Sequence, residues 1–558
     1  MREDKSGTNR LHLRPLFLLT LITCLAMFSS SAHGGSSPYA SLLHGSPGST
    51  LEDYVYCTFF GGSGNDRISG VAVTPEGEIV IVGGTFSTDL PVLNAYQEGY
   101  AGGEFPEHLF LMGDAFVVKM SEGGQLLWCT YLGGSELEEP SCVAIDDDGN
   151  IIVIGRTESN DFPTTGDALQ SVFAQGESDG FISVFDADGS LLHSTYIGGS
   201  GSDRLTDFDI DAMGNLVLVG RTASADYPVT HDAYQPDLNG ESDCFITVVS
   251  RDLSTVLYST FLGGGSTDAG NEIAIDGEDK FIISGSTSSR DFPVTDDALQ
   301  DDITGEERDC FLAKFSDSWG LLYATFLGGS HMDDCFGLAV DASDDIHVVG
   351  RSWSTDFPVT PDAIQESYSQ ESYNEDAVDS IYSVISADGR ALFYSTYLGY
   401  DSWDSFLNVG FDPEGNVVLS GLAGTGGFPV VRAFQGEHAG YSDVILMVLS
   451  PGGEILLSTY LGGTSFEHPS GQAMAGGTLI LVGNTHSSDF PVTEDAIQQN
   501  MRGNQDGFVF EIDLSRYLLS SEDIIEDPES PNILLPYGIL LGSIVVWAII
   551  MRRYFRAL

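Results

Sequence analysis

Acidic side chains recur at fixed places along this chain of 558 residues, and their carboxylates are the groups best placed to do chemistry. Five residues after the first glycine of each Y-L-G-G-type stretch stands an acid, and the seven are Asp66, Glu138, Asp203, Asp268, Asp333, Asp404 and Glu467. Hard cations such as calcium bind several carboxylate and carbonyl oxygens. This series, which we call the ring acids, is therefore the candidate metal site. Calcium is the one candidate cofactor.

The same pattern also has a structural interpretation. A second series of aspartates opens a predicted strand in every unit: Asp114, Asp179, Asp243, Asp309, Asp379, Asp443 and Asp506. A third series begins a D-F-P-type loop in six units: Asp89, Asp161, Asp226, Asp291, Asp356 and Asp489. An aspartate at the start of a strand or in a turn commonly accepts backbone N–H bonds that would otherwise be unpaired. Repetition in every unit fits that role, so both interpretations stay open.

Motifs for other chemistry are weak or missing. The sequence has no H-E-x-x-H, no Walker loop, no C-x-x-C pair and no EF-hand loop. The cluster His331–Cys335, H-M-D-D-C, could ligate a metal, although it is isolated. Arg156, Arg221 and Arg351 recur as G-R-[TS], and we expect them to pair with neighbouring aspartates. We predict that the protein is not an enzyme. The alternative is a hydrolase or lyase that uses the carboxylates.

These carboxylates belong to an internal repeat. The stretch Tyr196–Asp203, Y-I-G-G-S-G-S-D, returns seven times, and its first glycine recurs at steps of 72, 65, 65, 65, 71 and 63 residues. Each unit reads as two short strands around a tight turn, a loop, and two more short strands. Seven units of four antiparallel strands predict an all-β fold, a seven-bladed β-propeller. The extra strand Tyr54–Phe60 is expected to complete the last unit and close the ring.

The repeat units resemble the SBBP (seven-bladed beta-propeller) repeats of bacterial and archaeal proteins. The residues that carry the resemblance are Y-I-G-G-S-G-S-D, A-M-G-N-L-V-L-V-G-R-T-A-S-A-D-Y-P-V-T and S-D-C-F-I-T-V, and it extends over about Tyr54–Asp513. It implies a surface or secreted protein with no established common activity. Unit six departs from the pattern at Gly399-Tyr400 and Gly427–Pro429. Units one and five carry insertions, at about Glu98–Gly113 and Glu366–Val378.

The two ends of the chain predict export and anchoring. Residues 1–32 read as a signal peptide, 33–53 as a linker and 54–519 as the propeller. An acidic linker, 520–532, precedes 533–551, nineteen largely apolar residues that predict one transmembrane helix. The basic tail 552–558 is expected on the cytoplasmic side. We therefore predict a single-pass protein of the cell membrane with an extracellular propeller.

Strand direction predicts which face is displayed. The G-G turns, the D-F-P loops and the starts of the third strands should share one axial face, the top. The chain should leave the propeller at the opposite face, the bottom, after Asp513. The acidic top would then point away from the membrane.

Charge narrows the list of partners. A net charge of −60 argues against nucleic acid as a partner of the folded part. Six cysteines lie beyond the leader, as buried thiols or, in an oxidising compartment, in disulfides. The function that fits best is a binding or adhesion module whose top face binds an unknown protein or glycan. A structural component of the cell envelope is a further alternative.

Overall fold

The structure, a computed structural model, describes residues 55–102, 113–305, 307–369, 377–400, 402–424 and 426–520. They form seven four-stranded antiparallel sheets. Blade 1 consists of β2 (Asp66–Val73), β3 (Ile79–Thr85), β4 (Asp114–Met120) and β5 (Leu126–Leu132), and blade 2 of β6 (Glu138–Ile145), β7 (Ile151–Thr157), β8 (Asp179–Phe185) and β9 (Leu191–Ile197). Blade 3 consists of β10 (Asp203–Ile210), β11 (Leu216–Thr222), β12 (Asp243–Val249) and β13 (Val256–Leu262), and blade 4 of β14 (Asp268–Ile275), β15 (Phe281–Thr287), β16 (Asp309–Phe315) and β17 (Leu321–Leu327). The seven-bladed propeller is thereby confirmed, with one sheet per repeat.

The remaining blades follow the same order. Blade 5 consists of β18 (Asp333–Val340), β19 (Ile346–Ser352), β20 (Asp379–Ile385) and β21 (Leu392–Leu398), and blade 6 of β22 (Asp404–Phe411), β23 (Val417–Ala423), β24 (Asp443–Leu449) and β25 (Ile455–Leu461). Blade 7 consists of β26 (Glu467–Ala475), β27 (Thr478–Thr485), β28 (Asp506–Asp513) and β1 (Val55–Phe60). Strand β1 pairs antiparallel with β28, from Val55 opposite Ile512 to Phe60 opposite Gly507. The seventh sheet thus joins the first and last strands of the residues that the structure describes.

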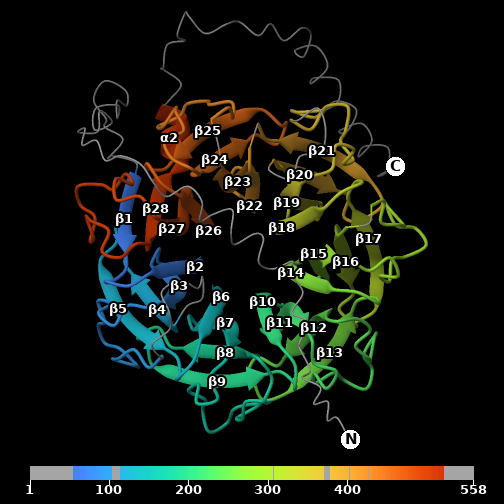
Figure 1. Cartoon of the computed structure of the whole chain (residues 1–558), viewed down its shortest axis with the longest axis horizontal. Coiled ribbons are helices and arrows are strands. Elements are labelled where there is room, and N and C mark those ends of the chain that lie inside the picture. Colours follow the sequence, from blue (N-terminus) through green and yellow to red (C-terminus); the bar gives the residue numbers. More distant parts are fainter. Residues whose placement is uncertain are drawn as a thin grey trace, which may run out of the picture. The chain divides into compact units, whose positions relative to one another are not determined.

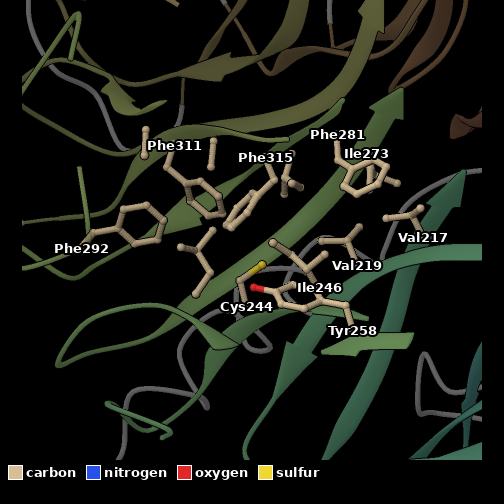
Figure 2. Packing of buried hydrophobic residues seen from close by; sticks show 14 of the residues in the cluster. Val217, Val219, Cys244, Ile246, Tyr258, Ile273, Phe281, Phe292, Phe311 and Phe315 are labelled. Atoms are coloured by element: carbon tan, nitrogen blue, oxygen red, sulfur yellow. The ribbon is translucent and has the colours of Figure 1, made fainter. Parts of the chain in front are cut away.

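The first strand of each blade is innermost, and the blades follow one another around the centre in chain order (Figure 1). Side chains of neighbouring sheets meet in apolar clusters between the blades. In one of them, Phe281, Phe311 and Phe315 of blade 4 pack with Val219 and Ile246 of blade 3 (Figure 2). Strands with both faces buried need apolar residues on both, which explains their near-continuous apolar runs.

The D-F-P loops do more than close the top. In blade 3 the loop descends beside the outermost strand, where the Thr230 N–H donates to the Ser259 oxygen at 3.0 Å and the Phe261 N–H to the Gln235 oxygen at 3.1 Å. The loop therefore covers a strand edge that would otherwise present unpaired backbone groups.

A short helix, α2 (Leu514–Ser520), follows the last strand. Its Tyr517 O–H donates to the Arg432 oxygen at 2.8 Å, so it packs against blade 6. No helix of the described residues is long and apolar enough to cross a membrane. The predicted signal peptide 1–32, the linker 33–53, the transmembrane helix 533–551 and the tail 552–558 lie outside the described residues, as does nearly all of the acidic linker 520–532.

Candidate functional site

Every ring acid opens an innermost strand and is buried. Asp203 shows the common arrangement. Its carboxylate accepts the Gly199 N–H at 2.7 Å, the Thr222 hydroxyl at 2.5 Å and the Ser224 hydroxyl at 2.8 Å. The ring acid thereby ties the G-G turn between two blades to the end of the neighbouring second strand. This is the structural role that the sequence left open.

The D-F-P aspartates lie beside the same turns. Asp226 accepts the N–H and the hydroxyl of Ser200 at 2.8 and 2.9 Å, at an exposed position. The first glycine of each turn leaves no room for a side chain, because a Cβ on Gly198 would stand 2.8 Å from the Asp203 carboxylate and 2.9 Å from that of Asp179. All three aspartate series therefore meet at the top face, as predicted.

A glutamine that the sequence analysis did not single out completes each junction. Gln235 donates to the Asp243 carboxylate at 2.7 Å, and its amide oxygen accepts the Gly263 N–H at 3.0 Å. The glutamine stands at the end of the D-F-P loop in all seven units, as Gln97, Gln170, Gln235, Gln300, Gln365, Gln435 and Gln498. Aligning the A-x-Q ends of the seven loops would have revealed it.

The structure does not gather the seven ring acids into one metal centre. They lie one to a blade, and among the described residues no three His, Cys, Asp or Glu side chains come together in a way that could hold a metal ion. Burial raises the pKa of Asp66 to about 6 and that of Glu138 to about 8, while the bonds from their serine, threonine and glycine partners act in the opposite direction. A calcium role for the ring acids stays a prediction without a multidentate site to carry it.

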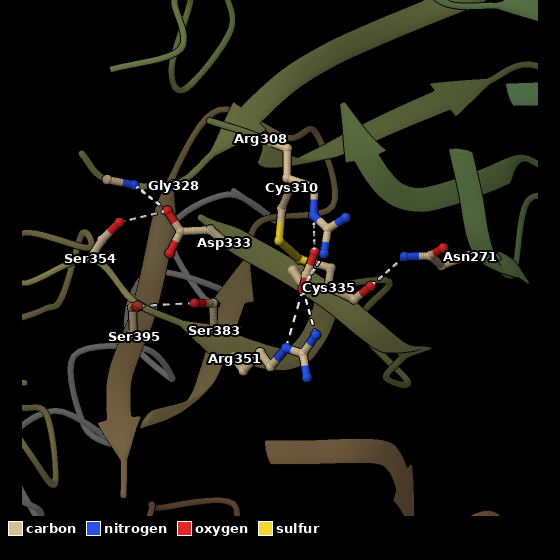
Figure 3. The surroundings of a disulfide bond; sticks show 12 residues. Asn271, Arg308, Cys310, Gly328, Asp333, Cys335, Arg351, Ser354, Ser383 and Ser395 are labelled. Carbon is tan, nitrogen blue, oxygen red and sulfur yellow. Dashed lines mark hydrogen bonds and ion pairs between the residues drawn. A yellow bond between two sulfur atoms is a disulfide. The ribbon is translucent and has the colours of Figure 1, made fainter. Parts of the chain in front are cut away.

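The H-M-D-D-C cluster takes part in covalent and ionic links instead. Cys335 forms a disulfide with Cys310, which joins β18 of blade 5 to β16 of blade 4 (Figure 3). The Asp334 carboxylate lies 2.6 Å from Arg308 and 3.0 Å from Arg351. Arg351 pairs with an aspartate as predicted. Arg156 pairs with glutamates rather than aspartates.

Reduction of this disulfide should destabilise the propeller. Closing a loop of 25 residues is worth about 3.5 kcal/mol in the chain-entropy model. We expect dithiothreitol to lower the free energy of unfolding of the native chain by that amount, measured by urea denaturation. A Cys310→Ala/Cys335→Ala variant should show the lower value without reductant and no further response to it. A native chain indifferent to dithiothreitol would contradict the assignment.

Arginines gather at the top of the innermost strands. Arg67 and Arg204 directly follow ring acids and are exposed. Arg156 donates to Glu139 at 2.9 Å, and Arg204 lies 3.5 Å from the same oxygen. Burial would raise the pKa of Glu139, but these guanidinium groups outweigh burial and lower it. Within a strongly acidic protein, this part of the top face is locally suited to an anionic group.

Aromatic side chains distinguish the top of blades 6 and 7. Trp403 and Phe466 stand directly before their ring acids, where the other blades have Asn65, Leu137, Ser202, Thr267 and Met332. Tyr441 stacks on Phe466 with ring centroids 5.0 Å apart, and Trp403 meets Trp353 edge to face at 5.9 Å. Exposure is 50% for Tyr400, 44% for Trp403, 69% for Tyr441 and 52% for Phe466.

Arg351 of blade 5 lies over two of these aromatic rings. Its guanidinium carbon lies 4.8 Å from the Trp353 ring and 5.4 Å from the Trp403 ring, within cation–π range. Large exposed aromatic rings beside an arginine are characteristic of binding surfaces. The exposed rings form two groups at neighbouring junctions, with Trp403 against Trp353 in one and Tyr441 against Phe466 in the other. We call Tyr400, Trp403, Tyr441 and Phe466 together the top aromatic patch.

Comparisons with known proteins give the protein no function. No family model matches the chain. Over 197 residues it is 22% identical to the regulatory protein FlaEY of Caulobacter vibrioides, an alignment that covers 34% of this chain and 20% of that protein's length. Among solved structures, the WD40 domain of Neurospora crassa Pan2 is 7% identical with a TM-score of 0.38 over 80% of this chain and 89% of that one. A gluconolactonase from Xanthomonas campestris is 9% identical with a TM-score of 0.32 over 83% and 91%.

Proposed function

We propose that this protein is an extracellular binding module, anchored in the cell membrane by 533–551, whose top face binds a glycan or protein outside the cell. The observation that carries the proposal is the top aromatic patch. Its four rings are exposed at positions where most other blades have small, polar or buried residues. Exposing them in water is unfavourable unless a partner covers them.

The chemistry of the patch suits an external ligand. Stacked aromatic rings offer flat apolar faces at little entropic cost, and the nearby arginines can pair with carboxylate or sulfate groups. The seven rigid sheets hold these side chains in place, as binding surfaces require. By contrast, the ring acids that a hydrolase or lyase would need are buried and bonded, so the aromatic patch supports binding better than carboxylate catalysis.

Three features support the extracellular location. The predicted signal peptide and apolar segment give a route across the membrane and an anchor. The Cys310–Cys335 disulfide suits an oxidising compartment. The resemblance to SBBP repeats agrees with a surface protein.

Alanine substitutions in the patch should weaken binding strongly while the fold persists. We expect Trp403→Ala and Phe466→Ala each to weaken binding at least tenfold to a ligand found by screening glycan and surface-protein arrays. Tyr96→Ala is the matched control, because Tyr96 is 45% exposed but lies on the loop beside the outermost strand of blade 1. If the patch variants bind as well as the control, the ligand does not use this face.

A further inference from the structure

Blade 5 departs from the repeat at two buried positions. The residue three positions before the first glycine of the second strand is aliphatic in six blades, as Val80, Ile152, Val217, Ile282, Val418 and Ile480, and is His347 in blade 5. The fourth residue of the third strand is Val117, Ile182, Ile246, Leu312, Leu446 or Val509, and is Tyr382 in blade 5. The two polar side chains contact each other, with 2.8 Å between His347 Nδ1 and the Tyr382 oxygen.

The junction between blades 5 and 6 is also packed differently at the bottom. At three other junctions an aromatic residue of the outermost strand fills the space below the next blade's turn. A Cβ on Gly124 would meet Tyr56, one on Gly189 would meet Trp128, and one on Gly389 would meet Tyr323. Tyr394 is the equivalent residue of blade 5, but nothing lies within 4 Å of a Cβ on Gly453, its counterpart in blade 6.

A hollow of about 750 Å³ lies at this place, and His347 and Tyr382 both line it. This volume is within the range of small-molecule sites. The rings of Tyr394 and Phe411 form further parts of its wall. Asp341, Asp362 and Asp412 also line it, and no lysine or arginine does. A site with aromatic walls and several carboxylates but no basic side chain favours binding of a cation.

The hydrogen bond between His347 and Tyr382 fixes which ring nitrogen of His347 carries the proton. Burial raises the pKa of the Tyr382 hydroxyl, so the hydroxyl stays protonated and can donate to Nδ1. Burial also lowers the pKa of His347, which keeps the ring neutral with its proton on Nε2. Nε2 is buried and has no hydrogen-bond partner among the described residues, and the nearest Asp341 oxygen is 3.7 Å away. His347 therefore places a buried N–H near the Asp341 carboxylate, within the wall of the hollow.

The carboxylates themselves are held in place. One oxygen of Asp412 accepts the N–H groups of Glu414 and Asn416 at 3.0 and 2.8 Å. Asp341 is held in the same way by Ser343 and Asp345, at 2.7 and 3.0 Å. The other oxygen of Asp412 accepts the Asn416 side-chain N–H at 2.7 Å, so a ligand would share it. The other oxygen of Asp341 lies 3.7 Å from His347 Nε2.

We propose that this hollow binds a compact organic cation, an amine with an apolar or aromatic body. Asp341 and Asp412 hold the ammonium group, and Phe411, Tyr382 and Tyr394 contact the body. The site lies on the bottom and is independent of the top aromatic patch.

Calorimetric titration of the purified chain tests the proposal with benzylamine, benzyl alcohol and benzoate, three probes of similar size and different charge. We expect saturable binding of benzylamine with a Kd of about 1 mM or lower, at least tenfold tighter than the alcohol, and no binding of benzoate. Equal binding of the three probes, or no saturable binding of benzylamine, would overturn it.

Matched variants locate the binding. Asp412→Asn removes the charge but keeps an acceptor for the turn, and should weaken benzylamine binding at least tenfold. Asp211→Asn makes the same change at the equivalent position of blade 3, where Asp211 accepts the Asn215 N–H at 2.7 Å, and should change nothing. His347→Val/Tyr382→Leu restores the residue types of the other blades, and should keep the melting temperature while losing binding. If Asp412→Asn and Asp211→Asn change benzylamine binding equally, the binding site does not lie at this junction.

Discussion

The Asp203→Ala variant is expected to lose about 4 kcal/mol of unfolding free energy, a large part of the stability of a typical domain. The Asp203 carboxylate is the acceptor for three groups: the Gly199 N–H and the Thr222 and Ser224 hydroxyls. Asp203 is 1% exposed, so water cannot replace the lost acceptor without rearrangement. Each buried donor left without a partner costs about 1–3 kcal/mol, and the empty space adds to this.

The same turn provides the control. Asp226 also accepts two bonds there, from Ser200, but it does so in contact with solvent. Asp226→Ala should therefore cost no more than about 1 kcal/mol. Urea denaturation of both variants beside the native chain measures the difference. Equal and small losses would show that the ring acids do not hold the junctions together, and would leave their recurrence without a structural explanation.

Periodicity was sufficient to predict the architecture. The spacing of the G-G turns predicted seven units, and the alternation of strand direction placed three series of aspartates on one face. Both predictions need only the chain itself, because a propeller repeats one local unit. The strand at the start of the chain could be assigned to the seventh blade because Asp513 ends a third strand.

Contacts between blades were harder to predict. Cys244 and Cys310 occupy the same position in successive units, but only Cys310 forms a disulfide in the structure. The reason is the residue that faces each of them from the next blade. Cys335 faces Cys310, whereas Gly270 occupies that place beside Cys244. The sequence shows which cysteines occupy equivalent positions in different repeats, whereas the disulfide joins non-equivalent positions of two neighbouring blades. Predicting the pair therefore requires knowing which residues face each other between blades.

The sequence could not show whether the ring acids bind a cation or hold the turns together. An acid at the start of a strand could face solvent, a cation or a hydroxyl group, and all three give the same spacing. The structure supplies hydroxyl donors at the end of the second strand and just beyond it, Thr222 and Ser224, and an N–H donor in the turn, Gly199. The positions of these donors are regular in the sequence, but their distance from the acid depends on the register of the two strands, which places Asp203 opposite Thr222.

We expect the propeller to be more stable at pH 5 than at pH 8. Burial raises the pKa of Glu138 to about 8 and that of Glu467 to about 7, and the nearby carboxylates Asp114 and Asp443 add to the rise. In the unfolded chain a glutamate titrates near about 4.3. Between these values the folded protein binds protons that the unfolded chain has released, so stability falls as the pH rises. The repulsion within a chain of net charge −60 acts in the same direction.

Glu138→Gln should remove much of this dependence, because glutamine resembles the protonated acid and cannot ionise. Glu138 is fully buried, and its contribution between pH 5 and pH 8 is on the order of 3–5 kcal/mol. The variant should therefore match the native chain in melting temperature at pH 5 and exceed it at pH 8. Glu136→Gln, two residues earlier and exposed, should follow the native curve. If native stability instead rises from pH 5 to pH 8, the junction carboxylates are ionised at little cost, and something other than a proton neutralises them.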